Sequence, residues 1–249
     1  MDYPEYFARF YDPIYEEMRS GVDTDFYLQA ISETGGRILE IGVGTGRFFV
    51  TALKNGADIY GIDTSESMIN ILLRKIDPAF HRRVSIQNAV DFKFPFRFNL
   101  ILAPFRVFSH LLSVQDQLSA CNNIYDHLED NGKLIFDLYV PDPAMIASGI
   151  NNQTDFRGEY EPGKKLSRTV NMKADIVNQI SDVSMTFRWD QGEQEVEKKW
   201  NFKFRFYFRY ELEHLINRSK LKLEKIFGDF NGSELKEGSR EFIVICCRS

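Results

Sequence analysis

A short apolar segment that contains Glu40 runs directly into glycines at alternate positions, Gly42, Gly44 and Gly46, and a helix-like pattern resumes at Arg47. This order predicts a buried strand, a tight turn and the start of a helix. Glycine leaves the main chain bare, so backbone N–H groups in such a turn can approach a ligand closely. The chemistry that these residues predict is the binding of a nucleotide-like molecule.

An acidic residue ends the next apolar segment. Residues 57–63 read as a second strand whose last residue is Asp63. A carboxylate there, next to the glycine turn, can accept hydrogen bonds from both hydroxyls of a ribose. The glycine spacing is GxGxG, whereas the dinucleotide-binding fingerprint places its third glycine one residue later. The pattern therefore favours a nucleoside ligand other than a dinucleotide.

Together, Glu40, the three glycines and Asp63 resemble the S-adenosylmethionine (SAM) site of the class I methyltransferases. The resemblance implies that the glycine turn and Glu40 hold the methionine half of SAM and that Asp63 binds the ribose. It also implies that Gly46 lets the helix and the strand pack closely. Residues 63–68 match the family pattern DxSxxM, which implies that Met68 packs on the adenine. The alternative for Met68 is ordinary helix core, because methionine fills cores readily.

Residues 87–92 resemble the family's turn after its third strand. The resemblance implies that Asn88 and the neighbouring Ala89 border the adenine. The family usually has an aspartate at the position of Asn88, but an asparagine carbonyl can accept the same hydrogen bond. Asp91 is the alternative acceptor.

Residues 98–118 resemble the family segment that opens the active site after strand four, although Asn99 stands where the family commonly has aspartate. The resemblance implies that Pro104 and Phe105 border the sulfonium of SAM and that His110 lies at the pocket. A histidine there can act as a general base near neutral pH. The alternative for His110 is a structural role at the start of a helix.

The N-terminal segment 7–12 matches the FAxxYD motif of small-molecule methyltransferases. The resemblance implies that an N-terminal helix folds over SAM and that Tyr11 reaches the active site as a catalytic residue. The lesser candidates for that role are Tyr3, Tyr6 and Tyr15. The alternative is an aromatic stripe that only packs on the domain.

The elements that position these residues alternate between strands and helices as far as residue 140, which predicts an α/β fold with a parallel, doubly wound sheet. Residues 222–228 and 240–247 read as a terminal antiparallel hairpin. The resemblance implies a seven-stranded, mostly parallel sheet closed by that hairpin. We expect residues 1–150 and 211–249 to form this core.

The pattern changes after Pro141 and Pro143, and the expected insertion, residues 151–210, reads as a small antiparallel β cap over the substrate site. Its expected strands cover residues 166–175, 178–189 and 195–210. Aromatic residues occupy one face of the last strand, and the other face carries Lys203, Arg205 and Arg209. These cations are expected to face solvent, or one of them to meet an anionic substrate. An alternative role for the cap is to pair two copies of the chain as a homodimer.

Composition limits the function classes. The net charge of the 249 residues is −5, and residues 1–30 alone carry seven acidic residues against two arginines. No basic face large enough for nucleic acid is evident. No apolar run is long enough to span a membrane, and no signal sequence is seen. The three cysteines lack metal-ligand spacing, so we expect no metal site and a cytoplasmic protein.

The sequence therefore predicts an enzyme that binds SAM and transfers its methyl group to a nitrogen or oxygen atom of a small molecule by direct in-line displacement. One alternative is a non-catalytic SAM sensor or interaction module on the same fold. A less favoured alternative is an NAD(P)-dependent oxidoreductase, which requires the GxGxxG spacing. The absence of a basic extension disfavours an RNA methyltransferase, and the cap disfavours a protein methyltransferase.

Overall fold

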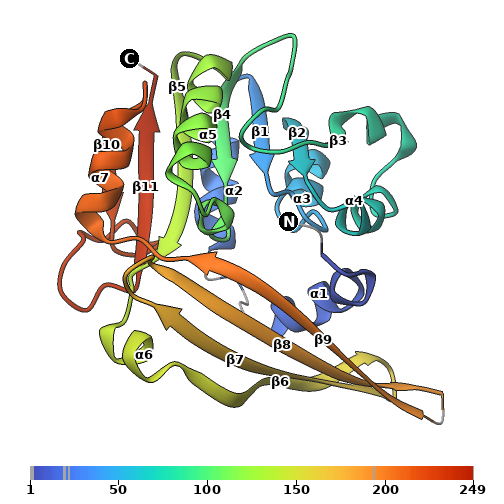
Figure 1. Ribbon diagram of the computed structural model, residues 1–249. Coiled ribbons are helices and arrows are strands. Elements are labelled where there is room, and N and C mark those ends of the chain that lie inside the picture. Colours follow the sequence, from blue (N-terminus) through green and yellow to red (C-terminus); the bar gives the residue numbers. More distant parts are fainter. Residues whose placement is uncertain (1–2, 19–20, 22, 193, 249) are drawn as a thin grey trace.

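Seven strands form a central sheet in the order β10-β11-β5-β4-β1-β2-β3 (Figure 1). The computed structural model describes residues 3–18, 21, 23–192 and 194–248. The first five strands are parallel, and β11 runs antiparallel to both β5 and β10. The predicted α/β fold with a terminal hairpin is therefore confirmed. The strand bounds are β1 (Arg37–Ile41), β2 (Asp58–Asp63), β3 (Val84–Ile86), β4 (Phe98–Ala103), β5 (Leu128–Tyr139), β10 (Lys222–Phe227) and β11 (Glu241–Cys247).

Helices cover both faces of this sheet, which is why its central strands are nearly continuous apolar runs. One face packs against α2 (Thr24–Ser32), α3 (Phe49–Lys54) and α4 (Glu66–Leu73). The other packs against α5 (Val114–His127) and α7 (Arg209–Arg218). In Figure 1, α5 lies in front of the sheet and α2 behind it.

Local hydrogen bonds set where two of these elements begin or end. The hydroxyl of Ser65 accepts from Met68 N and caps α4. The third strand ends at Ile86, because the chain turns soon after it and Phe92 N donates to Asn88 O. The helix after the glycine turn begins at Phe49, because the turn extends that far.

A second, four-stranded antiparallel sheet follows β5 and the short helix α6 (Pro143–Ser148). The sequence predicts three strands in this insertion, and the structure has four. The missed strand, β6, exposes most of its side chains, so its sequence shows little alternation. The four strands, joined in order as hairpins, are β6 (Ile150–Glu161), β7 (Lys164–Asp175), β8 (Ile180–Gln191) and β9 (Gln194–Arg205).

The last of these strands is shorter than its alternating aromatic pattern predicts. β9 ends at Arg205, and the aromatic residues beyond it do not share one face. Tyr207 is buried and donates to Phe108 O at 2.9 Å, whereas Phe208 precedes the first turn of α7 and is exposed. The division of the chain at residues 151 and 210 into core and cap stays a prediction.

Helix α1 (Glu5–Met18) lies between the two sheets (Figure 1). Its apolar side, with Phe7, Phe10 and Ile14, packs against Phe187 and Trp189 of the four-stranded sheet. The helix thereby joins the insertion to the carboxyl edge of the large sheet. No helix in the described part of the chain is long and apolar enough to cross a membrane.

Candidate functional site

A cavity of about 900 Å³ lies between the carboxyl ends of the parallel strands, helix α1 and the four-stranded sheet. Ligands of doubly wound α/β folds bind at this edge of the sheet. The volume is near the upper end of what one small-molecule pocket usually occupies. The sequence-predicted residues that line it are Tyr11, Gly42, Gly44, Asp63, Met68, Asn88, Ala89, Pro104, Phe105 and His110.

Two predicted residues, Glu40 and Gly46, do not line this cavity. Glu40 borders a separate cavity of about 20 Å³ beside the glycine turn. A Cβ on Gly46 would collide with Leu72 of α4, so this glycine lets the helix pack closely on the turn. The roles of all these residues toward a ligand stay predictions.

The glycine turn presents bare backbone to the cavity. Gly44 has φ +55°, in the left-handed region that other residues rarely adopt. A Cβ built on Gly44 meets only Gly42 O, at 3.9 Å, so the space in front of it is open. This opening is the close approach to main chain that the sequence predicts.

Asp63 fastens the turn to the end of β2. Its Oδ2 accepts from Gly44 N and its Oδ1 accepts from Ser65 N, both at 2.9 Å. Burial raises the pKa of this carboxyl, and the backbone hydrogen bonds from Ser65 and Gly44 oppose that rise. A carboxylate has about four acceptor positions, so capacity remains for the hydroxyls of a sugar.

Glu40 carries a buried polar atom that needs a partner. Its Oε2 makes no hydrogen bond to any residue that the structure describes. Burial raises the pKa of Glu40 to about 8, although the Arg47 guanidinium works against that rise. The neighbouring side chains are already engaged, since Thr45 donates to Asp12 and Arg47 forms a two-pronged ion pair with Asp23.

The opposite end of the cavity holds the residues expected at the adenine. Met68 is buried and borders the cavity, while Asn88 is exposed and its Oδ1 accepts from Val90 N at 3.2 Å. Asp91, the alternative acceptor, does not line the cavity. Asn99 is the second residue of β4, at the amino ends of the parallel strands, where its Oδ1 accepts from Arg37 N.

These features fit SAM, the cofactor that the sequence resemblance implies. The open cradle at Gly44 faces the cavity, and Glu40 offers an unsatisfied acceptor next to the turn. Asp63 and Met68, which are expected at the ribose and the base, line the same cavity. The residues present therefore suit an aminoacyl nucleoside.

A strained turn after β4 borders the same cavity. Phe105 and Arg106 both have positive φ, 59° and 63°, which non-glycine residues adopt at a cost of about 1–3 kcal/mol each. Asp137 holds the turn, because its Oδ1 accepts from Phe105 N and from the Tyr27 hydroxyl, each at 2.6 Å. Asp137 is not among the residues predicted from the sequence, although a charge within the apolar strand β5 is a signal of a functional or positioning role.

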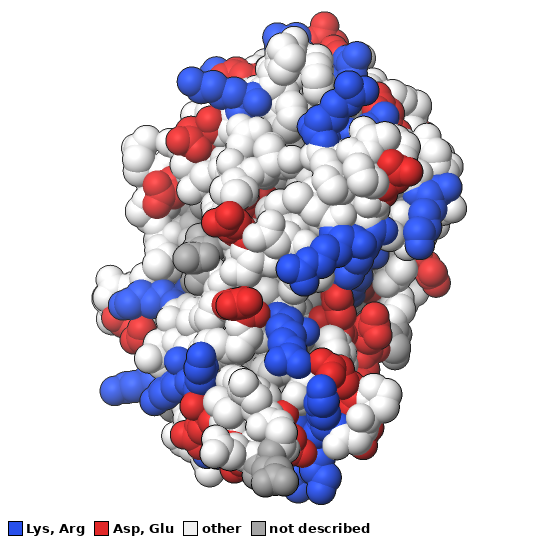
Figure 2. Space-filling model, turned by 90° about the vertical axis from the view of Figure 1, so that its right-hand side faces the viewer, with Lys and Arg blue, Asp and Glu red and all other residues white. Residues whose placement is uncertain are grey.

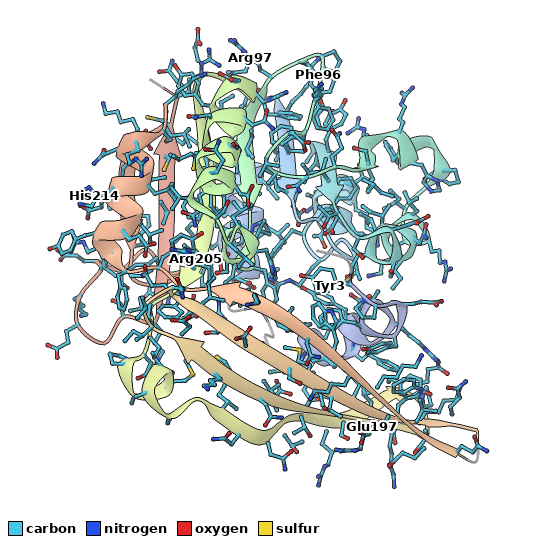
Figure 3. The ribbon with its side chains drawn as sticks, in the orientation of Figure 1. Tyr3, Phe96, Arg97, Glu197, Arg205 and His214 are labelled. Carbon is cyan, nitrogen blue, oxygen red and sulfur yellow. The ribbon has the colours of Figure 1, made fainter. Side chains whose placement is uncertain are left out.

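His110 lies at the pocket, as predicted, and its closest polar partner is Tyr3. The Tyr3 hydroxyl is 3.3 Å from His110 Nε2, and Figure 3 shows Tyr3 between the large sheet and β9. Burial lowers the pKa of His110 to about 4, so its imidazole is neutral at physiological pH. Tyr3, a lesser candidate from the sequence, thus joins Tyr11 at the cavity.

The three cations suggested for an anionic substrate do not line the cavity: Lys203, Arg205 and Arg209. Arg205 sits where β9 meets the core (Figure 3), pairs with Glu211 at 3.2 Å and donates to Leu112 O. It joins β9 to α7 and to the loop at Leu112 instead of lining the cavity.

Comparison with known proteins adds to this geometry. Residues 38–132 match a family model described as "Methyltransferase domain". A glycine/sarcosine N-methyltransferase of Parasynechococcus marenigrum (strain WH8102) is 29% identical over 126 residues, 48% of this chain and 44% of that protein. The chain spans about half the length of the curated relatives that it matches.

Solved structures resemble nearly the whole chain. An S-adenosylmethionine-dependent methyltransferase from Clostridium acetobutylicum ATCC 824 has a TM-score of 0.80 at 16% identity, covering 95% of this chain and 97% of the other. The sugar N-methyltransferase KedS8 from Streptoalloteichus sp ATCC 53650 has a TM-score of 0.75 at 13% identity, covering 96% and 92%. At such low identity these likenesses establish a shared fold.

Proposed function

We propose that the protein binds SAM and transfers its methyl group to a nitrogen or oxygen atom of a small molecule, because residues 38–132 match a methyltransferase domain and a solved S-adenosylmethionine-dependent methyltransferase shares the fold. When bound, SAM supplies a methyl group on a positively charged sulfur, which the lone pair of an acceptor displaces directly and in line. The protein then has to hold both molecules at short range and keep water away.

The shape of the cavity supports the proposal that the methyl acceptor is a small molecule. The cavity continues past the predicted SAM residues into a chamber roofed by the four-stranded sheet and bordered by Trp200, Phe202 and Phe204. A roofed chamber suits a small acceptor better than a polymer. On the face that Figure 2 shows, Lys and Arg side chains are interspersed with Asp and Glu, an arrangement that supports the expectation of no nucleic-acid partner.

SAM binding is tested first. Isothermal titration calorimetry should detect about one site, and Asp63→Ala should weaken binding by about 1–3 kcal/mol through lost charge-assisted hydrogen bonds. The control is Asp91→Ala, which removes a nearby carboxylate that does not line the cavity. Absence of SAM binding by a folded sample would refute the proposal.

Methyl transfer is tested separately with SAM that carries an isotopically labelled methyl group. The protein is incubated with a small-molecule extract, a protein fraction or an RNA fraction, and mass spectrometry follows the label. We expect label in the small-molecule fraction only. SAM binding without transfer to any fraction would favour the sensor alternative.

The predicted homodimer through the cap is independent of this chemistry. Light scattering coupled to size-exclusion chromatography measures the mass of the particle and tests it directly.

A further inference from the structure

Most methionine side chains of this protein line the cavity of the candidate site. The chain has six methionines, and the cavity is lined by five of them: Met18, Met68, Met145, Met172 and Met185. Met68 is on the side expected to hold the adenine, and the other four are on α1, α6 and the four-stranded sheet. Methionine is flexible and polarizable, so it adapts to apolar ligands of irregular shape. The chamber wall is therefore adaptable and apolar.

Flat rings complete this wall. Trp200, Phe202 and Phe204 alternate along β9 and all line the cavity. The rings of Trp200 and Phe202 stack with centroids 4.3 Å apart and an interplanar angle of 22°, and Tyr139 stacks on Phe204 at 6.1 Å. Such surfaces bind ring systems by stacking and by burial of apolar area.

Most charged side chains of the chamber are bound to other side chains of the protein. Arg168 is 2% exposed and donates to Asp155 and to the Tyr15 hydroxyl. Arg106 pairs with Glu241 at 3.2 Å, which leaves its Nε as a buried donor without a partner among the described residues. The remaining charged residues of the chamber, among those that the structure describes, are exposed at its rim: Asp116, Asp142 and Arg240.

Hydroxyl or phosphate groups of a ligand would thus meet apolar side chains on the roof of the chamber. Each such group would lose its water without gaining a partner, which lowers affinity. A pair of uncharged polar groups borders the same cavity, where the Tyr3 hydroxyl lies 3.3 Å from His110 Nε2. A ligand with a single polar atom at that point and an apolar remainder satisfies both regions.

On the basis of the proposed function, we propose that the methyl acceptor is a predominantly apolar, ring-containing molecule with one amine or hydroxyl group. Its rings lie against the wall formed by Met172, Met185, Trp200, Phe202 and Phe204, and its nitrogen or oxygen lies at Tyr3 and His110. A polyhydroxylated acceptor such as a sugar does not fit this wall, even though a sugar N-methyltransferase shares the fold.

The test compares two amines that differ in the body of the molecule. The protein is saturated with S-adenosylhomocysteine, whose binding is recorded first, and is then titrated calorimetrically with 4-phenylbutylamine or with glucosamine. We expect 4-phenylbutylamine to bind at least about tenfold more tightly, because it buries apolar area without burying unpaired hydroxyls. Equal or tighter binding of glucosamine, or no binding of either amine, overturns the proposal.

Two variants, one in the cavity wall and one on an exposed turn of the same sheet, test where the amine binds. Met185→Gln keeps the size of a wall side chain but makes it polar, and it should weaken 4-phenylbutylamine binding at least about fivefold. Ile176→Gln makes the same kind of change at a residue that is 64% exposed on the β7–β8 turn, and it should leave binding unchanged. Equal effects of the two variants overturn the proposal. Loss of S-adenosylhomocysteine binding in the unmodified protein would instead count against the proposed function.

Discussion

The hydroxyl of Tyr3 lies 3.3 Å from Nε2 of His110. Nδ1 of the same imidazole is buried and has no hydrogen-bond partner among the described residues. Both phenol and imidazole are uncharged at neutral pH, because burial raises the pKa of Tyr3 and lowers that of His110. With Tyr3 donating to a bare Nε2, its oxygen lone pairs are left to accept from an N–H or O–H group of the acceptor.

Tyr3→Phe should therefore reduce turnover while SAM binding is unchanged. The ring still packs on Phe7, at 4.9 Å, and on Trp200, at 5.1 Å, so the fold is retained. Loss of one hydrogen bond of about 1 kcal/mol predicts roughly a fivefold lower kcat/KM. Tyr210→Phe, at an exposed position, is the control and should have no effect. Steady-state kinetics with the identified acceptor decides, and an unchanged kcat/KM for Tyr3→Phe would contradict this role.

The pH dependence of stability should carry the signature of Glu40. Its folded-state pKa of about 8 is above the ordinary value of 4.5, so the folded protein binds more protons between these values. This contribution to stability is present below pH 4.5 and is lost as pH rises through 8, by up to about 5 kcal/mol. Chemical denaturation at pH 5 and pH 8 measures it.

Glu40→Gln removes the titration, so the variant should lose less stability than the unmodified protein when the pH rises from 5 to 8. His110 contributes with the opposite sign, because its lowered pKa makes protonation destabilising as pH falls from 6.5 toward 4. Identical pH profiles of the Glu40→Gln variant and the unmodified protein would show that Glu40 does not titrate in this range.

The strained turn after β4 predicts a separate effect for Asp137. Asp137→Ala leaves the Phe105 N–H and the Tyr27 hydroxyl without this acceptor, which should destabilise the fold by about 2–4 kcal/mol. The turn should then relax, and SAM affinity should fall because Phe105 borders the cavity. Tyr27→Phe is the control, since it removes one hydrogen bond but leaves the bond from Phe105 N in place.

The free energy of unfolding and the SAM affinity of the two variants together distinguish a specific role in holding the turn from a general effect on stability. Tyr27→Phe should lower the free energy of unfolding by about 1 kcal/mol without changing SAM affinity measured by calorimetry. If both variants weaken SAM binding in proportion to their loss of stability, Asp137 has no specific role in holding the turn.

The sequence was informative where local pattern and chemistry coincide. The alternation of strands and helices is a short-range signal, and it is confirmed in the structure. The pair of Tyr3 and His110 joins residues 107 positions apart, and the support of Phe105 by Asp137 depends on strand order. No local pattern encodes such contacts.

The four-stranded sheet shows a second limit, that of predicting strand bounds from the alternation of apolar residues. β6 was missed because most of its side chains face solvent, and β9 was extended too far because aromatic residues continue past its end. Members of this alternating series have different surroundings: Trp200, Phe202 and Phe204 line the cavity, whereas Phe206 is buried beyond the end of the strand. Periodicity alone could not separate a ligand-facing stripe from a core contact.

The glycine turn offers the sharpest test of where SAM binds. Gly44→Ala introduces a Cβ into open space in front of the turn, so the fold should bear only the cost of φ +55°, about 1–2 kcal/mol. The added methyl would occupy the open space through which the cofactor is expected to approach the main chain of the turn. We expect SAM affinity to fall at least tenfold, or about 1.4 kcal/mol, by calorimetry.

Gly56→Ala is a matched control for that variant. Gly56 also has positive φ, +84°, and open space around its Cβ position, but it lies after α3 and does not line the cavity. The same backbone strain should therefore lower stability by a similar amount and leave SAM affinity unchanged. If Gly44→Ala binds SAM as tightly as Gly56→Ala does, then SAM does not bind against the turn at Gly44. In that position the added methyl group would lie between SAM and the main chain.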